Sequence, residues 1–220
     1  MSEQLDKWTG EFGGEYHKRN CNTYRSVMGR VQVWKDIAQY VPMIGSYGYK
    51  YYSSSPVFDA EKPMTILEVG AGTGANLLAI KHLKTAHTLI ALEPNYEAVQ
   101  ILRDQHVTEE IMHMSWMDYV PIYKKVDLVF TYGVLIHVDP KERKKFMQKI
   151  IDTSSRYVVC CEYFSPTCRQ IDYHGNKDML WLDNYGGIYK DMGLKILSCK
   201  FYSKLLTGLD DITCWVMEKQ

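Results

Sequence analysis

Residues 66–77 read ILEVGAGTGANL, and they carry the clearest fold signal of the chain. A short apolar run that is typical of a buried strand leads into glycines 70, 72 and 74, and a helical pattern begins at Ala75. Glycines at such a turn let the backbone approach a ligand closely at the carboxyl end of a sheet. A tight turn without a ligand is the alternative, but the strand before and the helix after favour a ligand-binding loop.

Strand and helix patterns alternate on both sides of this loop. Strands are expected at 65–69, 88–92, 111–115, 126–132 and 156–163, with helices at 75–83, 96–105 and 140–153. Asp139 is a good N-cap for the last of these helices, because Pro140 and Glu142 follow it. This order predicts an α/β fold with a doubly wound, mostly parallel sheet. The runs 194–202 and 212–218 predict an antiparallel hairpin that closes the sheet.

The N-terminal part has a different pattern. Apolar residues at three- and four-residue steps predict a helix over 22–41 that ends before Pro42, and residues 45–63 have the composition of a loop. We therefore divide the chain into an N-terminal lid and helical segment, residues 1–62, and one compact ligand-binding domain, residues 63–220.

The composition limits the classes of function. The 220 residues contain 26 basic and 26 acidic side chains, which argues against nucleic acid as the main partner without excluding a local basic patch. The six cysteines form no CxxC pair, so reduced core thiols are expected rather than a metal site. The sequence has neither a membrane-spanning apolar run nor a signal peptide, so a cytoplasmic protein is expected. The sequence leaves the oligomeric state open.

A carboxylate follows the second predicted strand at Glu93, next to Pro94, where it can accept hydrogen bonds from two ribose hydroxyls. The glycine spacing is GxGxG, and the loop has no lysine for a phosphate. Together these features resemble the class I S-adenosylmethionine-dependent methyltransferases. The resemblance implies a Rossmann-like seven-stranded sheet with S-adenosyl-L-methionine as the cofactor. It also implies that Glu68, Gly70, Gly72 and Gly74 surround the amino-acid end of that cofactor.

The same resemblance assigns further cofactor and substrate residues. After the third strand, Ser115, Trp116 and Met117 would flank the adenine ring, and Asp118 would reach its amine; the alternative is that Trp116 and Met117 belong to the core. After the fourth strand, the resemblance puts three residues beside the sulfonium and the substrate: Thr131, Tyr132 and Gly133.

Two side chains are candidates for the general base. His137 follows the fourth strand, and an unperturbed imidazole titrates near neutrality, but a helix-end or core histidine is an equal alternative. Glu162 ends the fifth strand, where it can orient an amine or hydroxyl while Tyr163 stacks on a ring. A solvated glutamate is the alternative there.

Residues 8–20 read WTGEFGGEYHKRN and combine aromatic residues with glycines, without helical or strand periodicity. We interpret this run as a lid over the glycine loop, with Gly10, Gly13 and Gly14 as hinges. The resemblance to methyltransferases suggests that Tyr16 and Arg19 meet the carboxylate of the cofactor. A packed N-terminal arm is the alternative.

Five spaced phrases resemble a narrower family, the methylases encoded beside pseudaminic acid biosynthesis genes: residues 8–20, 130–137, 156–166, 171–178 and 210–215. This resemblance implies methylation of a sugar or nucleotide-sugar at O or N, a small-molecule acceptor. The candidate substrate residues are Gly133, Tyr163, Tyr173, His174, Asp178, Trp181 and Asp211. The connection that contains residues 173–181 also fits a packed surface loop. Methylation of a nucleobase and cofactor binding without turnover are the alternative functions.

Overall fold

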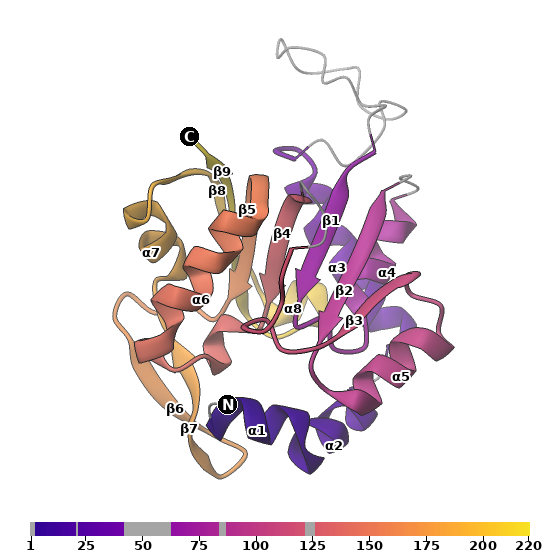
Figure 1. The fold of residues 1–220 in the computed structure, drawn as a ribbon. Coiled ribbons are helices and arrows are strands. Elements are labelled where there is room, and N and C mark those ends of the chain that lie inside the picture. Colours follow the sequence, from indigo (N-terminus) through magenta and orange to yellow (C-terminus); the bar gives the residue numbers. More distant parts are fainter. Residues whose placement is uncertain (1–2, 21, 42–62, 84–86, 122–125) are drawn as a thin grey trace.

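The computed structural model describes residues 3–20, 22–41, 63–83, 87–121 and 126–220. Its centre is a seven-stranded sheet of order β3-β2-β1-β4-β5-β9-β8 (Figure 1). Every pairing is parallel except the two made by β9. The predicted fold class is thereby confirmed. The strands are β1 (Thr65–Val69), β2 (Thr88–Glu93), β3 (Glu110–His113), β4 (Val126–Tyr132), β5 (Ser154–Glu162), β8 (Leu194–Tyr202) and β9 (Ile212–Lys219).

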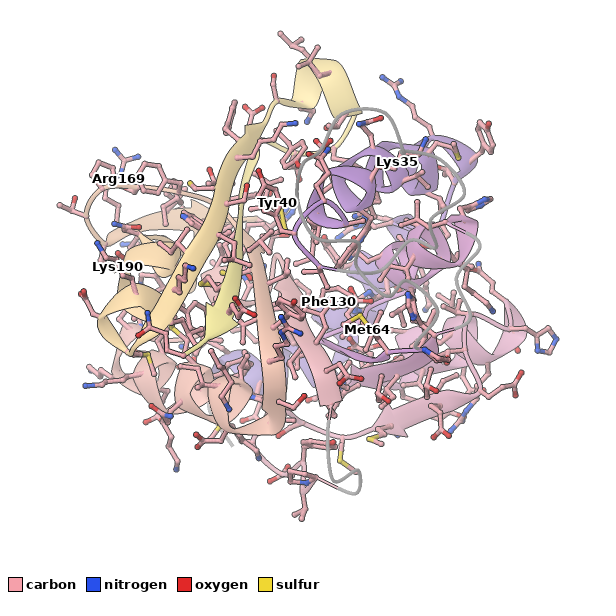
Figure 2. All side chains as sticks on the ribbon, turned by 90° about the horizontal axis from the view of Figure 1, so that it is seen from above. Lys35, Tyr40, Met64, Phe130, Arg169 and Lys190 are labelled. Atoms are coloured by element: carbon pink, nitrogen blue, oxygen red, sulfur yellow. A yellow bond between two sulfur atoms is a disulfide. The ribbon has the colours of Figure 1, made fainter. Side chains whose placement is uncertain are left out.

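Helices cover both faces of this sheet. On one face lie α3 (Tyr24–Ile37), α4 (Ala75–His82) and α5 (Tyr96–Asp104), and on the other α6 (Pro140–Thr153) and α7 (Tyr185–Asp191). Phe130 of β4, labelled in Figure 2, packs edge to face on Trp34 of α3, with ring centroids 4.7 Å apart. Successive residues of β5 alternate between the two cores, as the period of a strand requires.

Helix caps fix several of these boundaries. The Asp139 side chain accepts a hydrogen bond of 2.8 Å from the backbone N–H of Lys141, so α6 begins at Pro140 as predicted. Thr23 and Ser26 form a reciprocal capping box that starts α3. The third strand ends earlier than predicted, at His113, and the short helix α8 (Lys204–Thr207) was not predicted.

The connection expected around residues 173–181 is instead a β-hairpin, formed by β6 (Arg169–Tyr173) and β7 (Asn176–Leu182) outside the main sheet. Its two turn residues have left-handed φ angles, 50° at His174 and 76° at Gly175, as a tight two-residue hairpin requires. Most of β6 is exposed, so the apolar alternation that marks a strand is missing from its sequence.

The N-terminal run without periodicity is also regular structure. It forms α1 (Glu3–Thr9) and α2 (Glu11–Arg19), which we call the lid, residues 3–20. Gly13 and Gly14 lie inside α2 and are buried, so the prediction that they are hinges is wrong. A Cβ at Gly13 would lie 1.9 Å from the carbonyl oxygen of Trp8, so glycine permits close packing of the two helices there. Of the loop predicted at 45–63, residues 45–62 lie outside the described part of the chain.

The cysteine prediction is wrong for one pair. Cys161 and Cys214 face each other across the β5–β9 ladder with Cα atoms 4.0 Å apart, and they form a disulfide. Within the described ranges, Cys160 is a buried thiol, while Cys168 and Cys199 are exposed thiols. In the same ranges no helix is long and apolar enough to cross a bilayer, and no group of three acidic, histidine or cysteine side chains is arranged to hold a metal ion.

Candidate active site

The glycine loop joins β1 to α4 at the carboxyl edge of the sheet. Gly70, Gly72 and Gly74 have φ angles of 70°, 53° and 82°, a region that side chains other than glycine rarely adopt. A Cβ at Gly70 would also lie 2.7 Å from Val134 of the loop after β4. The backbone N–H groups of Gly70 and Ala71 donate to the carbonyl of Leu92, which ties the loop to β2. The geometry is that of a cradle for a ligand.

Beside this cradle are two ionisable side chains, each with a buried hydrogen-bonding atom that has no partner among the described residues. Glu68 is 1% exposed; its Oε1 accepts from Nδ2 of Asn76 at 2.8 Å, and its Oε2 has no partner among the described residues. Burial raises the pKa of Glu68 to about 8. The Arg30 guanidinium lies 5.1 Å above the ring of Tyr132, and its buried Nε has no partner among the same residues.

Sequence reasoning missed Arg30 and selected Arg19 instead, which is exposed at the end of α2. A signal was present, because Arg30 is three residues after Val27 and four before Trp34. On a helix this spacing puts Arg30 on the same face as the apolar stripe. Its positive charge lowers the pKa values of Glu68, Tyr132 and Tyr16, although burial keeps all three above their ordinary values.

Glu93 positions the glycine loop in this structure. The carboxylate is 4% exposed and accepts two backbone hydrogen bonds of 2.8 Å, from Gly72 and from Asn95. His17 of the lid lies 3.9 Å from the same carboxylate. Ribose binding by Glu93 therefore stays a prediction. The carbonyl of the neighbouring Pro94 lies 3.2 Å from Nε2 of His113.

The predicted adenine pocket divides into buried and exposed residues. Trp116 is 4% exposed, stacks on Tyr119 and donates from Nε1 to the carbonyl of Phe146 in α6 at 3.2 Å. Its indole is therefore a core side chain, the alternative interpretation. Ser115 is also buried, whereas Met117 and Asp118 are exposed beyond β3.

The loop after β4 contains the candidate base. His137 ends the short 3-10 helix η1 (Leu135–His137), and its Nδ1 lies 2.6 Å from the carbonyl oxygen of Met179 in β7. Burial lowers the pKa of His137 to about 4. The ring centroid lies 4.6 Å from that of Trp8 in the lid and 5.1 Å from that of Tyr173 in the hairpin. The histidine is thus oriented by β7 and covered by α1.

Glu162 does not face an open acceptor site. It is fully buried at the end of β5, and its two carboxylate oxygens accept from the backbone N–H groups of Val134 at 3.2 Å and Ile136 at 3.3 Å. Burial raises the pKa of Glu162 to about 7. The side chain therefore holds the loop that carries His137. The preceding loop residue, Gly133, is tied to β5 by its N–H bond to the carbonyl of Cys161 at 2.9 Å.

The lid and the β6–β7 hairpin meet at the carboxyl edge of the sheet (Figure 1). Lys7 Nζ lies 3.4 Å from Oδ1 of Asn176, and Gln4 donates to the carbonyl of Asp178 at 3.2 Å. Tyr16 and Tyr173 form a hydroxyl contact between the two elements. The lid is also fixed to the start of α5, because the N-cap residue Asn95 donates to the carbonyl of Trp8 at 2.9 Å.

The remaining predicted residues lie in different surroundings. Thr131 and Tyr132 end β4; the Thr131 hydroxyl lies against Glu162, and the buried hydroxyl of Tyr132 has no hydrogen-bond partner in the part of the chain that is described. Trp181 is 5% exposed and belongs to the core region, while His174 is an exposed turn residue. Tyr163 donates to Oδ2 of Asp210 at 3.0 Å, next to Asp211.

Comparison with known proteins identifies the central part of the chain. The family model described as a methyltransferase domain matches residues 66–154, from β1 through α6. The match is therefore to the part of the chain that contains the glycine cradle and the strand that ends at Tyr132. A methyltransferase domain with this glycine cradle implies S-adenosylmethionine as its cofactor. A sequence search of curated proteins finds no match.

Solved structures share the fold of the methyltransferase domain at low sequence identity. The magnesium protoporphyrin IX methyltransferase of Synechocystis PCC 6803, bound to S-adenosylhomocysteine, is 12% identical over 98% of this chain and 97% of its own, with a TM-score of 0.67. A Leishmania major S-adenosylmethionine-dependent methyltransferase is 14% identical over 99% of this chain and 87% of its own, at 0.64. The Burkholderia thailandensis 1,6-didemethyltoxoflavin-N1-methyltransferase is 13% identical over 72% of both chains, at 0.58.

Proposed function

We propose that this protein transfers a methyl group from S-adenosylmethionine to an oxygen or nitrogen atom of a small polar acceptor. The observation that carries the proposal is the glycine cradle flanked by the unused Glu68 Oε2 and Arg30 Nε. Once it is ionised beside an ammonium group, the Glu68 carboxylate is complementary, together with the Arg30 guanidinium, to a zwitterion. The amino-acid end of S-adenosylmethionine is such a group, so the residues fit this cofactor.

In this proposal Glu68 accepts from the α-ammonium and Arg30 donates to the α-carboxylate. Bound in this way, the cofactor supplies an electrophilic methyl group at its sulfonium. The protein must then align the acceptor and remove its proton, and such alignment provides much of the rate enhancement in this kind of displacement. Tyr132 and Gly133, at the end of β4, are proposed to lie beside the reacting groups.

His137 is the proposed general base, and Glu162 is assigned to positioning. Because a carbonyl accepts a hydrogen bond, the contact with Met179 places the imidazole proton on Nδ1. Nε2 then carries the lone pair that receives the acceptor proton. Tyr173 and Trp8 border the imidazole and restrict the orientation of the acceptor.

For the acceptor class, we propose a sugar or nucleotide-sugar. The support is the set of five sequence phrases that resemble methylases encoded beside pseudaminic acid biosynthesis genes, together with the aromatic and polar side chains that border His137. Aromatic rings can stack on the apolar face of a sugar while polar groups bind its hydroxyls.

The test uses the full chain with methyl-labelled S-adenosylmethionine and fractionated small-molecule extracts, analysed by mass spectrometry. The proposal predicts a labelled low-mass product that requires wild-type protein and is strongly reduced with His137→Gln. If no fraction yields a labelled product although S-adenosylhomocysteine binds, the alternative of a non-catalytic cofactor-binding protein replaces it.

A further inference from the structure

A hollow lies on the same edge of the sheet as the glycine cradle, beside the end of β5. It has a volume of about 440 Å³ and is bordered by the end of β5, the end of β8 and the start of β9. This size suits a small-molecule ligand. Its lining residues are Tyr163, Phe164, Leu182, Phe201, Lys204, Asp210, Asp211 and Thr213.

One wall of the hollow is apolar and unusually open to solvent. Phe164 is 47% exposed and Phe201 is 61% exposed, although both are large aromatic side chains. Phe164 is held in place by Trp215, with ring centroids 6.0 Å apart. Exposed aromatic side chains that line a hollow offer a flat apolar face to a ligand.

The same lining is also acidic. Asp210 and Asp211 face one cation in the lining, Lys204, so the lining carries a net charge of −1 (two carboxylates against one ammonium). Lys204 Nζ lies 3.2 Å from Asp210, and these side chains are 66% and 64% exposed. An ion pair this exposed contributes little free energy, so an incoming ammonium can replace Lys204 at low cost.

The hollow is linked to the candidate base through one strand end. Tyr163 lines the hollow and donates to Asp210 at 3.0 Å, and it directly follows Glu162. Glu162 in turn holds the backbone of the loop that carries His137. A ligand in the hollow therefore lies against the same strand end that positions the base.

We propose that this hollow is the specificity subsite for the acceptor, and that it takes the ring of an amino sugar with a cationic amine rather than the phosphates of a nucleotide-sugar. The ring lies against Phe164 and Phe201, and the ammonium pairs with Asp210 and Asp211. This inference rests on the proposed function, because it treats the hollow as part of the methyl-transfer site.

The test compares two probes of similar shape and opposite charge, 2-phenylethylamine and 3-phenylpropanoate. Each is titrated into the isotope-labelled full chain, and amide chemical shifts are followed by NMR. We expect the amine to shift the signals of Phe164, Phe201 and Thr213 and the carboxylate to leave them unchanged. Asp211→Asn should weaken amine binding about twofold to fivefold, as for an exposed charge contact. Asp191→Asn, an exposed acid in α7 with the same change of charge, should have no effect.

Equal binding of the two probes, absence of shifts in the hollow, or equal effects of the two variants would overturn the subsite. Titration of S-adenosylhomocysteine into the same samples separates this outcome from failure of the proposed function. If S-adenosylhomocysteine binds and 2-phenylethylamine does not, the subsite proposal alone is wrong. If 2-phenylethylamine binds and S-adenosylhomocysteine does not, the methyltransferase proposal fails.

Discussion

The Nδ1 atom of His137 lies 2.6 Å from the carbonyl oxygen of Met179. This contact joins the loop after β4 to β7 and fixes which imidazole nitrogen carries the proton. If Nε2 is the general base, His137→Gln should lower the rate of methyl transfer by about 10²- to 10⁴-fold. The affinity for S-adenosylhomocysteine should stay within about twofold, because the residue acts on the acceptor. A single-turnover assay combined with calorimetry measures both quantities, and an unchanged rate would remove His137 from the mechanism.

The pH dependence of catalysis provides a separate prediction. A base must be unprotonated to act, and burial lowers the pKa of His137 to about 4. The imidazole is therefore unprotonated at every pH well above 4. Protonation of His137 should lower the rate of methyl transfer only below about pH 5. We therefore expect that protonation of His137 does not lower kcat/KM near pH 6.5. The pH profiles of the wild type and His137→Gln should have the same shape in that range. An acidic limb near 6.5 that depends on His137 would contradict the burial of the base.

The Glu162 carboxyl should cause the free energy of unfolding to fall as the pH rises. Burial raises its pKa from 4.5 to about 7, so the folded protein holds this proton more tightly than the unfolded chain does. The resulting stabilisation is complete below about pH 4.5 and is lost as the pH rises through about 7. Urea unfolding between pH 5 and 8 should therefore show a shallower loss of stability in Glu162→Gln than in the wild type. Glu109→Gln, at an exposed position, should keep the wild-type slope; equal slopes in all three proteins would contradict this.

The packing of the lid can be tested at Gly13. A Cβ there would collide with the carbonyl of Trp8, so Gly13→Ala should separate α1 from α2 and uncover His137. We expect proteases to remove residues 3–20 several times faster than in the wild type. Glu15→Ala, an exposed position in the same helix, should behave as the wild type does. A wild-type digestion rate for Gly13→Ala would show that the two helices tolerate the change.

The sequence predicted the sheet well, because buried strands and amphipathic helices leave a periodic pattern of apolar residues. The run at 126–132 and the helix at 140–153 coincide with β4 and α6. The helical structure of the lid and the β6–β7 hairpin were missed, since α1 and β6 bury few side chains and only β7 reaches the core. Their regular structure depends on long-range contacts such as Lys7 with Asn176, which no local pattern records.

The site was predicted in part for a similar reason. The glycine loop is visible in sequence because its left-handed backbone requires glycine. The role of Glu162 is not, because a carboxylate at a strand end looks the same whether it faces an acceptor or binds backbone N–H groups. Arg30 was missed because it lies within a helix far from the motif, and folding brings it beside Glu68.

Glu68 and Arg30 are proposed to bind the amino-acid end of the cofactor, and calorimetry with two ligands measures this contact. S-adenosylhomocysteine has this end, whereas 5′-methylthioadenosine lacks it. We predict that Arg30→Met weakens the binding of S-adenosylhomocysteine about 10- to 100-fold, the range for a lost hydrogen bond to a charged group. Arg30→Met should leave the affinity for 5′-methylthioadenosine unchanged, and Arg19→Met should change the affinity for neither ligand. If S-adenosylhomocysteine does not bind the wild type, or if Arg30→Met weakens both ligands equally, the claim is contradicted.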